Sequence, residues 1–297
     1  MNMNRQLTTI ACAATALAVL GSSAKAAYTW NGSISGDWSV PGNWNEGVPV
    51  DTVAGGNLET PSTERLVFNV SSGNIVPTSN IPALGGVPDN SNTNNTPEID
   101  LLNGSLTFTA PGFSNQGLCG PRGGVWTTTV GDGILGNGTA SLTLVGNFSQ
   151  GLARDGQVFR FQVASDGTLT LDGNGSGGAL WLSYDTGRRV EVLLDGGSFT
   201  TPDPLEMLRN STDLGPSFFD LRVIGSTVTA DFGVDFADID AVRAATGDGL
   251  TFRSSTMVTL SAEDNMDGTF TVTAVPEPGS LALLGFGGLM LGLRRRR

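Results

Sequence analysis

Short runs in which apolar residues alternate with threonine recur along the chain. Examples are Leu106-Thr-Phe108, Leu142-Thr-Leu144, Leu169-Thr-Leu171 and Phe270-Thr-Val272. Because successive side chains of a β-strand point to opposite faces, this period of two predicts strands with one buried and one solvated face. Asn-Gly, Asp-Gly and Gly-Gly pairs between the runs mark turns. The pattern therefore predicts an all-β body.

A longer repeat overlies this alternation. Comparable glycines follow successive apolar runs at spacings of 34, 29, 30 and 28 residues, and they are Gly104, Gly138, Gly167, Gly197 and Gly225. Periods between about 20 and 50 residues are typical of stacked architectures, in which each unit buries its apolar face against its neighbours. We therefore predict a parallel β-solenoid or β-helix-like repeat body. An antiparallel β-sandwich has similar short strands, so it stays open as the alternative.

One segment departs from the β pattern. Asp235 stands where a helix N-cap is expected, Gly247 stands where a helix stops, and the residues between them carry one apolar face. We predict one short helix near 235–246.

The N-terminal segment has the three-part layout of a secretory signal. Arg5 precedes an apolar stretch from Ile10 to Leu20, and small residues end in Ala24-Lys25-Ala26. We predict cleavage after Ala26. The chain then divides into a signal peptide over residues 1–26, a glycine-rich β-repeat body over 27–274 and a tail over 275–297.

The tail combines a short motif, an apolar run and a block of arginines. The run from Ser280 to Leu293 is shorter than the roughly 20 residues of a comfortable transmembrane helix, which suits a temporary anchor in the inner membrane. Arginines at its end stay on the cytoplasmic side, so the body lies outside that membrane. The residues that carry this pattern are Pro276, Glu277 and Pro278 of the motif, with Arg294, Arg295, Arg296 and Arg297 at the end.

This tail resembles the PEP-CTERM sorting signal of Gram-negative bacteria. The resemblance implies processing by an exosortase-type membrane transpeptidase near the Pro-Glu-Pro motif. It also implies an exported protein at the cell envelope, at the outer surface or outside the cell, linked to extracellular polysaccharide or biofilm matrix. We expect a non-catalytic structural or adhesive scaffold.

The net charge of the body limits the kinds of partner that it can bind. The body from Ala27 to Val275 has ten arginines, twenty-seven acidic residues and neither lysine nor histidine, which gives 10 − 27, or about −17. Nucleic-acid binding needs basic groups that release counterions, so nucleic acid is not expected as a partner.

The same composition limits catalysis. Without histidine or lysine the body cannot build a Ser-His-Asp triad, a histidine metal site or a Schiff-base lysine. We expect no enzyme. The alternative is a polysaccharide-acting hydrolase or lyase of the β-helix type with paired carboxylates, for which Asp231, Asp235, Asp238 and Asp240 cluster in sequence.

Three tryptophans lie near the start of the body. Trp30, Trp38 and Trp44 fall in a segment from Tyr28 that resembles the opening of secreted bacterial β-repeat proteins, including autotransporter-like passengers. Exposed rings could stack on sugars, whereas buried rings would plug the open end of the first repeat. Burial is the favoured interpretation, because aromatic residues most often supply buried area, and stacking on sugars stays open as the alternative.

An acidic turn near the C-terminus is a candidate cation site. Asp264, Asn265 and Asp267 stand before Gly268, as in half of a calcium loop. The bidentate glutamate of an EF-hand is absent, because Ala274 stands at its position. A hairpin turn explains the same residues, so calcium is a candidate cofactor and a plain turn is the favoured interpretation.

Overall fold

The computed structural model describes fourteen segments of the chain: residues 26–34, 40–46, 52–53, 57–58, 64–70, 98–109, 124–134, 138–145, 157–172, 180–181, 188–206, 217–232, 250–254 and 258–277. They contain seventeen strands and one 3₁₀ turn. Their bounds are β1 Ala26–Trp30, η1 Pro41–Asn43, β2 Thr52–Val53, β3 Asn57–Leu58, β4 Glu64–Asn69, β5 Glu98–Thr109, β6 Gly124–Val130, β7 Ala140–Val145, β8 Gln157–Ala164, β9 Gly167–Asp172, β10 Leu180–Trp181, β11 Arg188–Asp195, β12 Ser198–Glu206, β13 Ser217–Leu221, β14 Thr227–Asp231, β15 Leu250–Ser254, β16 Val258–Asp264 and β17 Phe270–Pro276.

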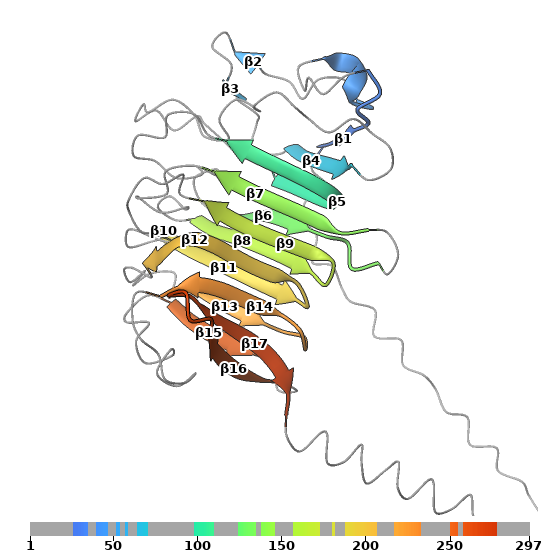
Figure 1. Ribbon diagram of the computed structural model, residues 1–297. Coiled ribbons are helices and arrows are strands. Elements are labelled where there is room, and N and C mark those ends of the chain that lie inside the picture. The colour runs from blue at the N-terminus through green and yellow to red at the C-terminus, as the bar shows by residue number, and fades with distance from the viewer. Residues whose placement is uncertain are drawn as a thin grey trace, which may run out of the picture.

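Fifteen of the strands form one sheet that folds back on itself at the long strand β5 (Figure 1). The first half of β5 continues through β6, β8, β11, β13 and β15, with β4 and β1 on its other side. The second half of β5 continues through β7, β9, β12, β14, β17 and β16. We call these two parts the first and the second half-sheet.

The chain alternates between the half-sheets. Each repeat places one strand in the first half-sheet, turns, and places the next strand in the second, as β8 and β9 do around Ser165 and Asp166. Successive repeats pair in parallel, so Gln157 of β8 aligns with Arg188 of β11, and Thr168 of β9 with Ser198 of β12. The units therefore stack on one another.

Glycine at the turns allows this close stacking. A side chain at Gly197 would collide with the backbone oxygen of Ala164 in the preceding repeat. Gly225, at the equivalent turn of a later repeat, has φ +90°, which L-amino acids with a side chain rarely adopt. The glycine spacing seen in the sequence thus follows the turns of the repeats.

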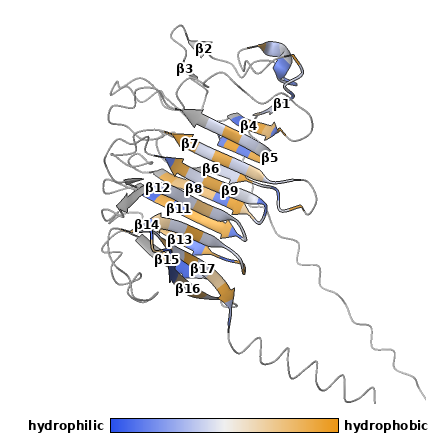
Figure 2. Ribbon diagram, viewed as in Figure 1, coloured by the Kyte–Doolittle hydropathy of each residue, from blue (hydrophilic) through white to orange (hydrophobic). Residues whose placement is uncertain are grey.

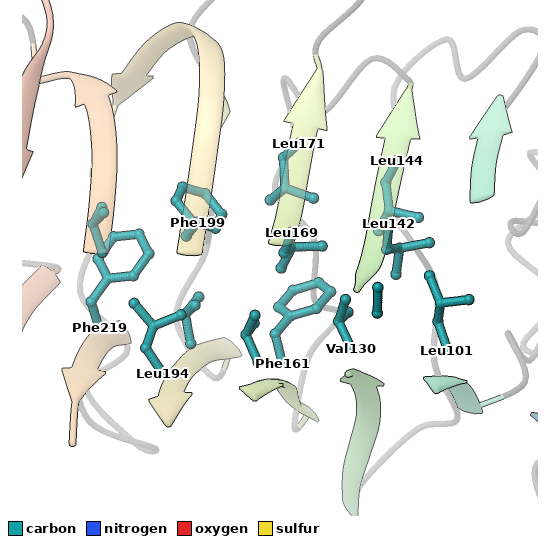
Figure 3. Packing of buried hydrophobic residues seen from close by; sticks show 14 of the residues in the cluster. Leu101, Val130, Leu142, Leu144, Phe161, Leu169, Leu171, Leu194, Phe199 and Phe219 are labelled. Carbon is teal, nitrogen blue, oxygen red and sulfur yellow. The ribbon is translucent and has the colours of Figure 1, made fainter. Parts of the chain in front are cut away.

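The core lies between the two half-sheets, where their inward side chains meet (Figure 3). Hydropathy alternates along the strands, as Figure 2 shows, because only every second residue faces inward. Residues of like position stack from one repeat to the next. The inward rows include Leu66, Ile99, Thr128, Phe161, Val192, Phe219 and Phe252 in the first half-sheet, and Leu106, Leu142, Leu169, Phe199, Val228 and Val272 in the second.

The second half-sheet ends differently from the rest of the stack. Strand β17 pairs antiparallel with β14, and β16 pairs antiparallel with β17. Reversal of direction lets a simple hairpin finish the sheet, since parallel pairing would need another crossover. Among the described strands, antiparallel pairing is confined to the pairs β14–β17, β16–β17 and β2–β3.

The prediction of an all-β body is confirmed, and most strand pairs are parallel. The antiparallel pairing that the β-sandwich alternative requires is found, among the described strands, only in the pairs β14–β17, β16–β17 and β2–β3. The helix predicted near 235–246 lies outside the described residues.

Candidate functional surfaces

The tryptophans near the start of the body belong to the core. Trp30 is 1% exposed and Trp44 is 3% exposed. Their ring centroids are 5.0 Å apart in an edge-to-face arrangement, and both rings contact Phe68 of β4. These buried rings are not available to stack on sugars, and they pack at the first strands of the sheet. Trp38 lies outside the described residues.

The acidic turn between β16 and β17 satisfies its polar groups internally. Asp264 Oδ1 accepts a hydrogen bond from the Met266 amide at 2.7 Å. Asp267 Oδ1 accepts from the amide of Thr269 at 2.9 Å and from its hydroxyl at 2.6 Å. These bonds lower the pKa of Asp267 below 3.8. Asn265 Nδ2 donates to the Thr269 hydroxyl at 2.8 Å, so the side chains hold a hairpin turn.

The predicted sorting residues begin inside the last strand. Pro276 ends β17 and aligns with Val258 of β16, and Glu277 follows directly with its side chain half-buried. At the other end, Ala26 begins β1 and aligns with Glu64. Pro278 and the four arginines from Arg294 to Arg297 lie outside the described residues.

The outward face of the first half-sheet carries ion pairs between buried acidic residues and partly exposed arginines, which the sequence reasoning missed. Arg65 of β4 reaches two acids of β5, with nitrogen–oxygen distances of 3.0 Å to both Glu98 and Asp100. Three strands further along the first half-sheet from β5, Glu191 of β11 pairs with Arg160 at 2.7 Å and with Arg189 at 2.5 Å. The three acidic residues are at most 9% exposed. The signal that could have revealed the first cluster is the period-two spacing of Glu98 and Asp100 on an apolar strand.

Burial changes the acidity of one of these groups. The pKa of Asp100 is raised above 3.8, chiefly because burial disfavours its charge. The charge of Glu98 raises it further, whereas Arg65 lowers it. The structure thus brings together a carboxylate pair other than the predicted cluster. Of that cluster, Asp231 lies on β14, and Asp235, Asp238 and Asp240 lie outside the described residues.

The outward face of the second half-sheet carries serine and threonine at twelve aligned positions on six strands. Every one of these side chains is half-buried or exposed. We call this surface the hydroxyl face. Its first row is Ser105, Ser141, Thr168, Ser198, Thr227 and Thr273, and its second row is Thr107, Thr143, Thr170, Thr200, Thr229 and Thr271.

Hydrogen bonds between neighbouring strands tie hydroxyls of this face together. The hydroxyls of Thr170 and Thr200 lie 3.0 Å apart, and Thr227 donates to Ser198 at 2.9 Å. Each hydroxyl has one donor and two acceptor sites, so a bond to one neighbour leaves capacity for a further partner. The face can therefore offer ordered hydrogen-bonding groups to a ligand.

No helix within the described segments is both long enough and apolar enough to span a bilayer. The predicted anchor from Ser280 to Leu293 lies outside these segments.

Comparison with known proteins identifies the tail. Residues 274–297 match the PEP-CTERM protein-sorting motif. Searches of curated proteins and of solved structures found no match. The match begins two residues before Pro276, so it overlaps the end of β17. The motif indicates export, processing by exosortase and sorting to the cell surface.

Proposed function

We propose that the chain is a non-catalytic scaffold of the cell surface or extracellular matrix, and that its stacked repeats form a β-solenoid. The observation that carries the proposal is the direct junction between the last strand and the sorting motif. Ala274, Val275 and Pro276 belong both to β17 and to the matched motif. A sorting enzyme that acts on this motif would thus deliver a rigid sheet stack with almost no intervening linker.

The build of the body supports a scaffold. In the first half-sheet, the strands of successive repeats pair in parallel, so each repeat contacts the repeats before and after it in the same way. Repeat stacks of this kind present long surfaces. The two outward faces differ in chemistry: one carries arginines paired with buried carboxylates, and the other carries hydroxyls. Extracellular polysaccharide is the proposed partner, because its hydroxyl-rich surface can exchange hydrogen bonds with such a face.

The first experiment is an intact mass measurement, with terminal peptide sequencing, on the chain recovered separately from the envelope and from the medium. We expect an N-terminus at Ala27 and loss of the residues beyond the Pro276–Pro278 motif. A variant with Glu277→Ala and Pro278→Ala should keep Arg294 to Arg297 and stay in the inner membrane. If the wild-type chain keeps these arginines in every fraction, it is a membrane-tethered protein and the matrix proposal fails.

The second experiment tests the partner. The processed chain is mixed with polysaccharide from the producing cells and sedimented at several calcium concentrations. We expect co-sedimentation without added calcium. Absence of association at every calcium concentration would overturn the matrix assignment.

The buried pair Glu98 and Asp100 favours one alternative, a polysaccharide-acting hydrolase or lyase. Such enzymes need two carboxyl groups with different pKa values, and burial raises the pKa of Asp100. Release of reducing ends from glycans, lost on Glu98→Gln and on Asp100→Asn, would favour the enzyme. Ion pairing of both acids with Arg65 favours the scaffold, because it gives them a structural role.

A further inference from the structure

The hydroxyl face repeats one chemical group in two directions. Neighbouring strands of a sheet are about 4.8 Å apart, and alternate residues of a strand are about 6.6 Å apart. Six aligned strands therefore carry two rows of hydroxyls over roughly 24 Å, which is five strand spacings. The strands of this face lie side by side in Figure 1, from β5 to β17. A periodic surface suits a partner that is itself periodic.

We propose that the hydroxyl face is a docking surface for a neutral, extended polysaccharide chain that lies along the stacking direction. The inference rests on the proposed matrix function and adds the chemical class of the ligand, its place and its orientation. An extended β-1,4-linked hexose chain advances by close to one strand spacing per sugar. One sugar can then lie opposite each strand over several strands.

The charges near the hydroxyl face favour a neutral polysaccharide over a polyanionic one. Arg65, Arg160 and Arg253 lie on the first half-sheet, on strands β4, β8 and β15. The hydroxyl rows contain no charged residue, and the acids Asp172 and Asp231 follow them on β9 and β14. A polyanionic polysaccharide would meet repulsion from these acids and from the acidic body as a whole.

Because each contact is weak, we expect the hydroxyl face to bind a polysaccharide and not a single sugar. A hydrogen bond to sugar replaces one to water, so each hydroxyl contributes little by itself. Many contacts along one chain add, because the second and later contacts form at high effective concentration. We therefore expect binding that strengthens with chain length and is undetectable for a monosaccharide.

The face is also held in shape before a ligand arrives. Threonine is β-branched and has a restricted first side-chain torsion. Hydrogen bonds between Thr170 and Thr200, and between Thr229 and Thr271, at 3.0 Å each, fix neighbouring strands relative to one another. Less side-chain freedom is then lost on binding, which favours association.

The test measures binding of the processed full chain to amorphous cellulose, a neutral β-1,4-glucan, and to calcium-free alginate as the polyanion. The test variant combines Thr143→Val, Thr170→Val and Thr200→Val, which removes three neighbouring hydroxyls of the second row and keeps side-chain shape. The matched control replaces the same three residues with serine, which keeps the hydroxyls. Circular dichroism and the thermal midpoint establish that both variants fold.

We expect the wild-type chain to bind cellulose and not alginate, the valine variant to bind cellulose about tenfold more weakly or worse, and the serine control to stay within about twofold. Equal binding by the valine variant, preference for alginate, or no binding to cellulose would overturn the proposal. Co-sedimentation with the producer's own polysaccharide distinguishes failure of the proposed docking face from failure of the proposed matrix function. If the valine variant still co-sediments as the wild type does, the face is wrong and the matrix function stands. If the wild type does not co-sediment, the matrix function itself fails.

Discussion

A buried hydroxyl in the first half-sheet gives a sharp test of the packing. Thr128 of β6 is 0% exposed and lies in an inward row between Ile99 of β5 and Phe161 of β8. Its hydroxyl oxygen has no hydrogen-bond partner. A polar atom thus occupies an apolar stack without compensation. We predict that Thr128→Val stabilises the fold, because valine places a methyl group where the hydroxyl is.

The magnitude follows from the cost of an unsatisfied buried group. A buried donor or acceptor without a partner costs about 1–3 kcal/mol, and the valine methyl adds apolar burial. We therefore expect the free energy of unfolding to rise by about 1–3 kcal/mol. For a chain of this size, the thermal midpoint should rise by about 2–4 °C for each kcal/mol.

The assay is urea unfolding of the processed chain, followed by circular dichroism. The control is Thr143→Val, where the side chain is half-buried on the hydroxyl face, and there we expect a change within about 0.5 kcal/mol. If Thr128→Val leaves the midpoint unchanged or lowers it, the Thr128 hydroxyl has a partner in solution. The account of this row as an apolar stack would then be wrong.

Four further substitutions test the core, the turns and the buried acids. Phe161→Ala removes a ring that is 0% exposed and should lower the free energy of unfolding by about 3–5 kcal/mol in the same urea assay. Gly197→Ala should lower the free energy of unfolding by about 1–3 kcal/mol, because the new Cβ would collide with the Ala164 oxygen. The loss should be larger than for Gly225→Ala, where the space is open and only backbone strain at positive φ remains. Because the pKa of Asp100 is raised in the fold, the folded chain binds the proton more tightly than the unfolded chain does. This residue's contribution to stability therefore falls as pH rises from 3.8 through the raised value, so Asp100→Asn should help stability more at neutral pH than at acid pH when melting is followed across pH.

The sequence was sufficient to predict the class of fold because two of its signals are local. Alternation of apolar residues with threonine predicts strands, and glycines at near-constant spacing predict turns that recur once per repeat. Both signals correspond to real features, since Leu169 and Leu171 face the core and Gly197 allows close approach of the preceding repeat. The reversal of pairing at β17 had no such signal, because period-two alternation is the same in parallel and antiparallel strands.

The fate of the tryptophans could not be settled without three-dimensional structure. Burial is the commoner role of an aromatic ring, but a ring near a chain end can also be an exposed platform, and its neighbours in space decide which. Here Phe68, which is more than twenty residues away from Trp44 in sequence, completes the cluster that buries both rings. The ion pairs of Arg65 with Glu98 and Asp100 depend in the same way on a contact between separate repeats.

The hydroxyl face was hidden for a different reason, which lies in the lengths of the repeats. Each Ser/Thr-x-Thr pattern is visible locally, yet a row exists only when the patterns align across strands. Ser105 aligns with Ser141, Ser141 with Thr168, and Thr168 with Ser198, so the offsets are 36, 27 and 30 residues. Because turns and crossovers differ in length, no constant period superimposes the patterns. Backbone hydrogen bonding sets the register instead, and a one-residue slip would move these hydroxyls into the core. The buried leucines between the hydroxyls penalise that slip, so the same apolar packing that holds the stack together also aligns the outward rows.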